Sequence, residues 1–184
     1  MEGQPVSGDR YYMNIGFASD SRKALRINIH TDYADFLEQY SGKFYGLNTT
    51  LRYRYNDKLS FRYDFRFSKD SYNFGAVDVI SKDSIIFGGR KLITFENKAS
   101  LQFIFKNDMS LLLSARHYMN SGKYLQYYFL EKNGDLTPTS YNNSHNFSIN
   151  YFNIDLVYSW QFAPGSFLSL NYKNAIETES EIFN

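Results

Sequence analysis

The sequence predicts an all-β fold, an antiparallel up-and-down transmembrane β-barrel. Residues 1–184 would form a single, partial barrel domain with about eight main strands. Three observations predict it. Apolar and polar residues alternate along repeated runs, the links between runs are alternately short and long, and aromatic residues lie at both ends of the runs. The composition agrees, because 17 Tyr, 17 Phe and only 3 Pro favour strands and argue against disorder.

The alternation has a period of two residues. Along residues 59–68, five apolar or aromatic residues alternate with Ser, Arg, Asp, Arg and Ser. Successive side chains of a strand point to opposite faces, so this pattern sorts the two kinds of side chain onto two faces of a sheet. The same pattern predicts strands near residues 10–18, 25–33, 46–56, 59–68, 93–105, 109–118, 152–162 and 167–175.

The links between these strands alternate in length. Short links rich in turn-forming residues occupy 19–23, 56–58, 106–108 and 163–166, and long links occupy 34–45, 69–92 and 119–151. Within the long links, residues 72–80 and 124–130 still have strand character, which favours tall hairpins over irregular loops. Short turns on one rim and long loops on the other are typical of outer-membrane barrels, where they are periplasmic and extracellular, respectively.

Aromatic residues on the apolar face mark both ends of the strands. Beside the short links lie Phe17, Tyr55, Phe105 and Phe162, and at the opposite ends lie Tyr33, Phe67 and Tyr172. Two aromatic girdles around an aliphatic band are typical of a barrel that crosses two membrane interfaces. The sequence therefore predicts the cell outer membrane as the location and outer-membrane lipid as a partner.

A soluble fold would produce the same alternation. In a secreted or periplasmic β-sandwich the apolar face is turned inward, and such a domain would bind glycan or another ligand through aromatic loops. Phe65, in the middle of a predicted strand, separates the two hypotheses. It would face lipid in a barrel and would be buried in a sandwich.

The strand directions predict that the chain is part of a larger barrel. The first strand runs into the short link at 19–23 and the eighth leaves the short link at 163–166, so both outer ends lie on the extracellular side. Barrel chains of this class normally begin and end in the periplasm. We therefore expect further strands on both sides, although eight strands could also close a small barrel. The first residues show no signal peptide.

Charge and cysteine content exclude several function classes. The formal net charge is +1, which gives no field that would favour nucleic acid. The absence of Cys excludes disulfides, thiol nucleophiles and Cys-ligated metals. The sequence contains no run of 18 apolar residues, the length that would predict a transmembrane helix. The sequence suggests no cofactor.

The polar face carries a basic patch, formed by Arg52, Arg54, Arg62 and Arg66 on the two strands that flank the 56–58 turn. In a barrel these side chains face the lumen, where guanidinium groups could attract anionic solutes or hold the carboxylates of a plug. The alternative is a structural ladder in which Asp64 pairs with Arg62 or Arg66 and the side chains fill a narrow lumen.

No residues have the spacing of a catalytic or metal site, so we expect no enzyme activity. Ser114 and His117 fall on opposite faces of one strand, and His30 shares a face with Asp32 but has no nucleophile nearby. The three histidines lack metal-ligand spacing. The sequence Gly88-Gly89-Arg90 is too short for a phosphate loop.

The long links are rich in aromatic residues: Phe36, Tyr40, Phe44, Tyr45, Tyr72, Phe74, Tyr124, Tyr127, Tyr128 and Tyr141. Such loops could bind a glycan or a protein partner. Packing of the loops on one another is the default interpretation.

Residues 153–166, with the sequence Asn-Ile-Asp-Leu-Val-Tyr-Ser-Trp-Gln-Phe-Ala-Pro-Gly-Ser, resemble the C-terminal barrel region of a Gram-negative outer-membrane family. That barrel is a domain of unknown function, and members typically carry a carbohydrate-binding-like module upstream. Asp20-Ser21-Arg22-Lys23, Phe87-Gly88-Gly89-Arg90 and Arg116-His117-Tyr118 are similar to further family motifs in the same order. The resemblance covers residues 12–176 and implies a fold and a location, not a reaction. The module, a signal peptide and a closing aromatic strand are absent from this sequence.

Overall fold

A computed structural model describes residues 10–36, 42–81, 84–131 and 134–181. They form one antiparallel sheet of nine strands and contain no helix. The strands are β1 (Arg10–Ala18), β2 (Leu25–Phe36), β3 (Gly42–Arg54), β4 (Leu59–Ser81), β5 (Ser84–Lys106), β6 (Met109–Leu130), β7 (Leu136–Pro138), β8 (Phe147–Ala163) and β9 (Ser166–Glu181). The predicted all-β antiparallel fold is confirmed.

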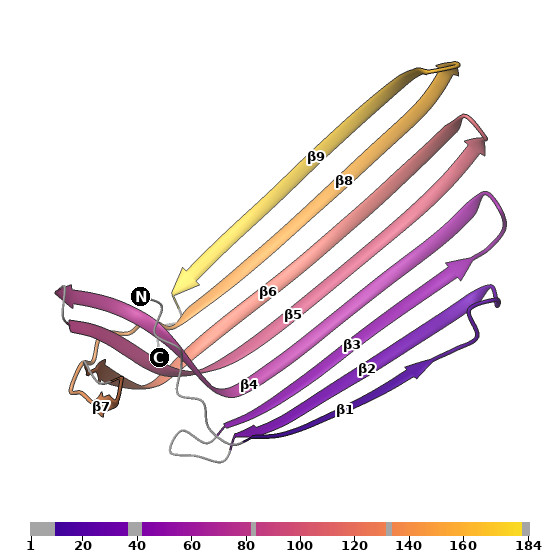
Figure 1. The fold of residues 1–184 in the computed structure, drawn as a ribbon. Helices are drawn as coiled ribbons and strands as arrows, with labels where there is room; N and C mark the ends of the chain where they lie inside the picture. Colours follow the sequence, from indigo (N-terminus) through magenta and orange to yellow (C-terminus); the bar gives the residue numbers. More distant parts are fainter. Residues whose placement is uncertain (1–9, 37–41, 82–83, 132–133, 182–184) are drawn as a thin grey trace.

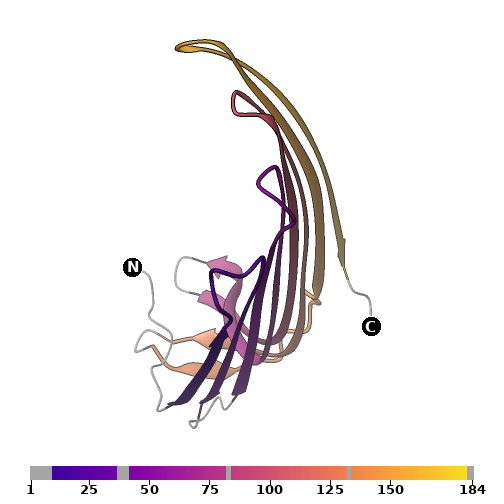
Figure 2. The same ribbon diagram turned by 90° about the vertical axis from the view of Figure 1, so that its right-hand side faces the viewer.

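Eight strands form a simple meander in the order β1-β2-β3-β4-β5-β6-β8-β9, with the short β7 attached to β6 (Figure 1). In a view turned by 90°, the sheet is bowed into an arc (Figure 2). Within the described residues β1 and β9 do not pair with each other, so these strands do not close into a barrel. The eight main strands correspond to the eight that the sequence predicts.

The tall hairpins are also confirmed. β4 and β5 are each 23 residues long and β6 is 22, so they extend far into the long links predicted at 69–92 and 119–151. Register shifts between Asp70 and Asn73 and between Ala76 and Asp78 interrupt the β4–β5 ladder. Such bulges bend a strand and increase its twist. Beyond them, the ends of β4 and β5 lie on the inner side of the arc (Figure 2).

The register joins the apolar side chains of neighbouring strands into one continuous face. Phe61 of β4 pairs with Leu101 of β5, which pairs with Leu113 of β6, and Leu113 pairs with Leu156 of β8. This face is solvent-accessible: Leu101 is 37% exposed and Leu113 is 41% exposed. The described residues form a single layer, so no second sheet covers the apolar face.

The only well-packed region among the described residues lies at the long-hairpin end. Ile86 is completely buried there, and Tyr128 and Asn146 are each 5% exposed. The other buried hydrophobic residue is Ala34. No helix in the described part of the chain is long and apolar enough to cross a membrane.

Aromatic side chains gather on the apolar face beside the short turns. Phe17, Tyr55, Phe105 and Phe162, predicted as one girdle, are all exposed. Three of them contact the aromatic ring two residues earlier on the same face, at centroid distances of 6.4 Å for Tyr53–Tyr55, 4.7 Å for Phe103–Phe105 and 5.9 Å for Trp160–Phe162. The result is a row of rings at one end of the meander.

Candidate functional site

A hollow of about 750 Å³ lies on the polar face, near the turn between β1 and β2 and the turn between β3 and β4. Its lining includes six basic side chains, from Arg22, Lys23, Arg26, Arg52, Arg54 and Arg62. No acidic side chain is among the described residues that line it. We call this hollow the basic groove.

The strand register brings these arginines together. Arg26 of β2 pairs with Arg52 of β3, and Arg52 pairs with Arg62 of β4, so three guanidinium groups stand in one cross-strand row. Arg54 follows Arg52 by two residues and therefore shares its face. Like charges directly opposite each other destabilise a sheet, so this row is unfavourable unless negative charge compensates it.

Compensation within the sheet is partial. Arg62 holds Asp64 with two contacts, from Nε to Oδ2 at 2.6 Å and from Nη2 to Oδ1 at 2.6 Å. The hydroxyl of Thr50 also donates to Asp64, at 2.8 Å. Arg26 donates to the backbone carbonyl of Ser21. The carboxylate of Asp64 is therefore held by Arg62 and Thr50, and no contact joins it to Arg26 or Arg52.

Three basic side chains of the groove have no such partner. Lys23, Arg52 and Arg54 form no ion pair and no side-chain hydrogen bond with any described residue. The basic groove therefore has an uncompensated positive charge.

Arg66 does not belong to the groove, although the sequence predicts it in the same patch. It pairs with Glu96 of β5, with Nη1 3.6 Å from Oε2. Glu96 also accepts from Nε of Arg116 on β6, at 2.6 Å. The structure thus separates the predicted patch into a groove containing Arg52, Arg54 and Arg62 and a paired ladder containing Arg66.

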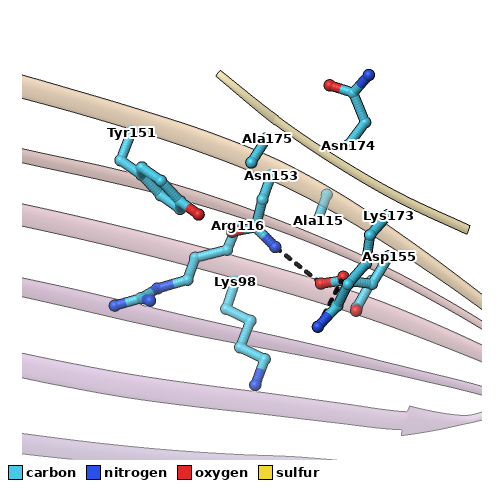
Figure 3. A pocket seen from close by; sticks show the side chains of 10 residues that line it. Lys98, Ala115, Arg116, Tyr151, Asn153, Asp155, Lys173, Asn174 and Ala175 are labelled. Atoms are coloured by element: carbon cyan, nitrogen blue, oxygen red, sulfur yellow. Dashed lines mark hydrogen bonds and ion pairs between the residues drawn. The ribbon is translucent and has the colours of Figure 1, made fainter. Parts of the chain in front are cut away.

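A second hollow on the polar face, of about 460 Å³, is lined by the basic side chains of Lys98, Arg116 and Lys173 and by the acidic side chain of Asp155 (Figure 3). Asp155 accepts from the amide nitrogen of Asn153 at 2.8 Å and lies 3.8 Å from the ammonium of Lys173. Arg116, which also lines this hollow, is the partner of Glu96. We call it the paired hollow, because most of its charged groups have opposite partners.

The loop aromatics of the long hairpins pack on one another, as the default interpretation expects. The hydroxyls of Tyr72 and Tyr128 lie 2.6 Å apart, and the rings of Tyr124 and Tyr127 stack at 5.6 Å. Other contacts join Phe74 to Tyr128 and Tyr127 to Tyr141. Of the other predicted loop aromatics, Phe36 belongs to β2, Phe44 and Tyr45 belong to β3, and Tyr40 lies outside the described residues.

The motif Gly88-Gly89-Arg90 supports this aromatic packing, a role that sequence reasoning missed. Arg90 donates to the hydroxyl of Tyr124 at 2.8 Å and to the amide oxygen of Asn73 at 3.1 Å. A Cβ on Gly88 would overlap the ring of Tyr124. The glycines are needed because aromatic rings lie directly against the backbone.

The histidines lie apart from one another. Ser114 and His117 lie on opposite faces of β6, as the sequence predicts. Ser114 lines the paired hollow, whereas the Nε2 atom of His117 lies 2.9 Å from Oδ1 of Asn150 on the other face. His30 and Asp32 share a face, with Nε2 of His30 4.0 Å from Oδ1 of Asp32. Within the described residues, no group of three His, Cys, Asp or Glu side chains could hold a metal ion.

Tyr128 provides a test of the packing at the long-hairpin end. Burial, together with the nearby Tyr72 hydroxyl, raises the pKa of the Tyr128 phenol. The native state therefore favours the protonated phenol, and this contribution to stability is complete below the ordinary pKa of about 10. It is lost as the pH rises through the raised native pKa.

We expect Tyr128 to ionise after most other tyrosines in an alkaline ultraviolet titration of the folded protein, and Tyr128→Phe to remove this late phase. The variant should also lose less stability than the wild type when the pH rises above about 10. Ionisation of Tyr128 in the same phase as the exposed tyrosines would contradict the packing.

The sequence was compared with models of known protein families, and one model matches it. Residues 3–184 match the model of a domain of unknown function, DUF5916. Neither a search of curated proteins nor a search of solved structures gives a match. Because the match covers nearly the whole sequence, the chain belongs to the DUF5916 family.

Proposed function

We propose that the chain forms part of the wall of an outer-membrane β-barrel, with a transport, binding or scaffold role and no catalysis. The observation that supports this proposal is the exposed apolar face of a bowed, single-layer antiparallel sheet. Outer-membrane lipid would cover that face, and the polar face would line the lumen. Both hollows are lined from the polar face, which would be the lumen side.

The distribution of aromatic residues supports the same proposal. The rings beside the short turns form a row on the apolar face, with Tyr55 67% and Phe162 56% exposed. Such rings suit a membrane interface, where an apolar ring can lie next to polar headgroups. The short turns would then lie at the periplasmic rim and the aromatic cluster of the long hairpins would project outside the cell.

The open edges lead us to propose a larger barrel. Within the described residues β1 and β9 each pair with one neighbour only. An unpaired backbone edge inside a bilayer costs several kcal/mol for each unsatisfied group, so strands span membranes as closed barrels. Additional strands next to β1 and β9 would close the arc.

Single-cysteine labelling tests the orientation of the faces, because the natural sequence contains no Cys. Phe65 lies on the apolar face of β4, and Ser68 lies on its polar face. In membranes, we expect Phe65→Cys to react with a maleimide confined to lipid and to resist an aqueous, membrane-impermeant one. Ser68→Cys should resist the lipid-confined reagent.

The two variants distinguish the hypotheses. Protection of Phe65→Cys from both reagents would support a soluble sandwich with a buried apolar face. Rapid reaction of Phe65→Cys with the aqueous reagent would contradict both. The protein should also sediment with outer membranes, and recovery as a detergent-free soluble monomer would overturn the proposal.

A further inference from the structure

We propose that the basic groove binds a small solute that carries two or more oxyanionic groups, either phosphates or carboxylates. The groove is the one defined above by the basic side chains of β2, β3, β4 and the turn before β2. The proposal deepens the proposed function, since in a barrel wall the groove would face the lumen. The hollow and its charges, however, are features of the sheet itself.

The first argument is the charge balance inside the hollow. Six basic side chains line it and no acidic one does, among the described residues. Arg22 pairs with Asp20 and Arg62 pairs with Asp64, which leaves Lys23, Arg26, Arg52 and Arg54 without a carboxylate partner among the described residues. An anionic ligand would provide the charge that the sheet lacks.

The paired hollow on the same face strengthens this argument. There, Asp155 lies beside Lys173 and Arg116 pairs with Glu96, whereas Lys98 forms no ion pair with any described residue. Two of the three cations of the paired hollow therefore have a carboxylate partner, compared with two of the six cations of the basic groove. The basic groove therefore concentrates positive charge without carboxylate partners in one area of the polar face, as expected for a site that attracts anions.

The spacing of the row indicates the size of the ligand. Neighbouring strands lie about 4.8 Å apart, so the guanidinium groups of Arg26, Arg52 and Arg62 extend over roughly 10 Å. One monatomic anion cannot contact the whole row. Two linked oxyanions can, because the planar guanidinium group binds carboxylate and phosphate oxygens in pairs.

Neutral side chains on the same face add hydrogen-bonding groups. Ser60, Ser100 and Gln102 line the groove next to the arginines. Their hydroxyl and amide groups could donate to the remaining oxygens of the ligand. The groove thus combines positive charge with directional hydrogen-bond donors. A patch that attracts anions by charge alone would need only the charge.

Titration calorimetry of the folded protein in detergent tests the proposal. Inorganic pyrophosphate represents linked phosphates, citrate represents linked carboxylates, and acetate is the singly charged comparison at the same ionic strength. We expect pyrophosphate, citrate or both to bind more tightly than acetate. The stronger of the two identifies the oxyanion class.

Two matched variants locate the site. Arg52→Gln should weaken binding about tenfold, as expected for the loss of charge-assisted hydrogen bonds. Arg116→Gln removes the same charge from the paired hollow and should change the affinity by less than about twofold. Arg52→Gln should fold normally, because it removes a like-charge contact, and Arg54→Gln provides an independent second variant.

Equal weakening by Arg52→Gln and Arg116→Gln would show that the ligand senses only the overall field, and this would overturn the site. Binding of the two probes no tighter than acetate would also overturn it. Neither result depends on lipid, whereas the labelling of Phe65→Cys reports only on the orientation of the faces. Failure of the binding site and failure of the barrel proposal are therefore distinguishable.

Discussion

Leu113→Arg is expected to destabilise the membrane-inserted protein by about 2–4 kcal/mol, the cost of a charged residue on the lipid face of a barrel near the bilayer midplane. Leu113 lies in the middle of the apolar face, between Leu101 and Leu156. Its side chain is 41% exposed in the isolated sheet, so the bilayer would be its main environment. An arginine there would have to leave water for hydrocarbon.

The neighbouring residue provides a closely matched control. Leu112 is also a leucine of β6 with 41% exposure, but it lies on the opposite face, between Gln102 and Val157. It lines the basic groove, which the proposed barrel would keep hydrated. Leu112→Arg should therefore cost less than about 1 kcal/mol.

The measurement is reversible urea unfolding from lipid vesicles, with both variants compared with the wild type. If Leu112→Arg proves to be the more damaging substitution, the assignment of the two faces is reversed. Equal and small effects would indicate that neither face contacts lipid. The comparison isolates orientation, because position along the strand, residue type and exposure are nearly identical.

The two-residue period is sufficient to predict the strands because it depends only on the sorting of apolar and polar side chains onto the two faces of a sheet. β1 coincides with the predicted run at 10–18, and the start of β4 at Leu59 agrees as well. The outer halves of β4, β5 and β6 were predicted only in part. There the alternation is interrupted by bulges and glycines, so side chains no longer alternate in a way that a sequence pattern reveals.

The basic site was predictable only where it depends on local geometry. Arg52, Arg54 and Arg62 flank one short turn, so their parity along the strands places them on the same face. Arg26 joins them only through the pairing of β2 with β3, and a long link separates these two strands in the sequence. Glu96 lies on the next strand, so its pairing with Arg66 depends on the β4–β5 register.

The packing at the long-hairpin end depends on glycines whose role the sequence alone did not reveal. Gly122 of β6 pairs directly with Phe147 of β8. A Cβ at Gly122 would overlap Cε1 of that ring and would lie 2.7 Å from Cζ and 3.1 Å from Cδ1. The glycine therefore provides the space in which the ring lies flat against the neighbouring strand.

Gly122→Ala should accordingly destabilise the folded protein by about 1–3 kcal/mol, the usual cost of overpacking. The Phe147 ring would have to move, and with it the guanidinium group of Arg90, which lies 5.8 Å from the ring centroid. Loss of this contact should open the long-hairpin end first. Urea unfolding gives the change in stability, and limited proteolysis shows where the opening begins.

A double-mutant cycle with Phe147→Ala identifies the cause, because all three of the nearest atoms to the added Cβ belong to that one ring. If the ring is responsible, Gly122→Ala should cost little once Phe147 is alanine, and the two changes should be strongly non-additive. Full additivity would assign the cost to the β6 backbone itself. In that case the backbone conformation of β6 would require the glycine, and the contact with the Phe147 ring would not be the cause of the cost.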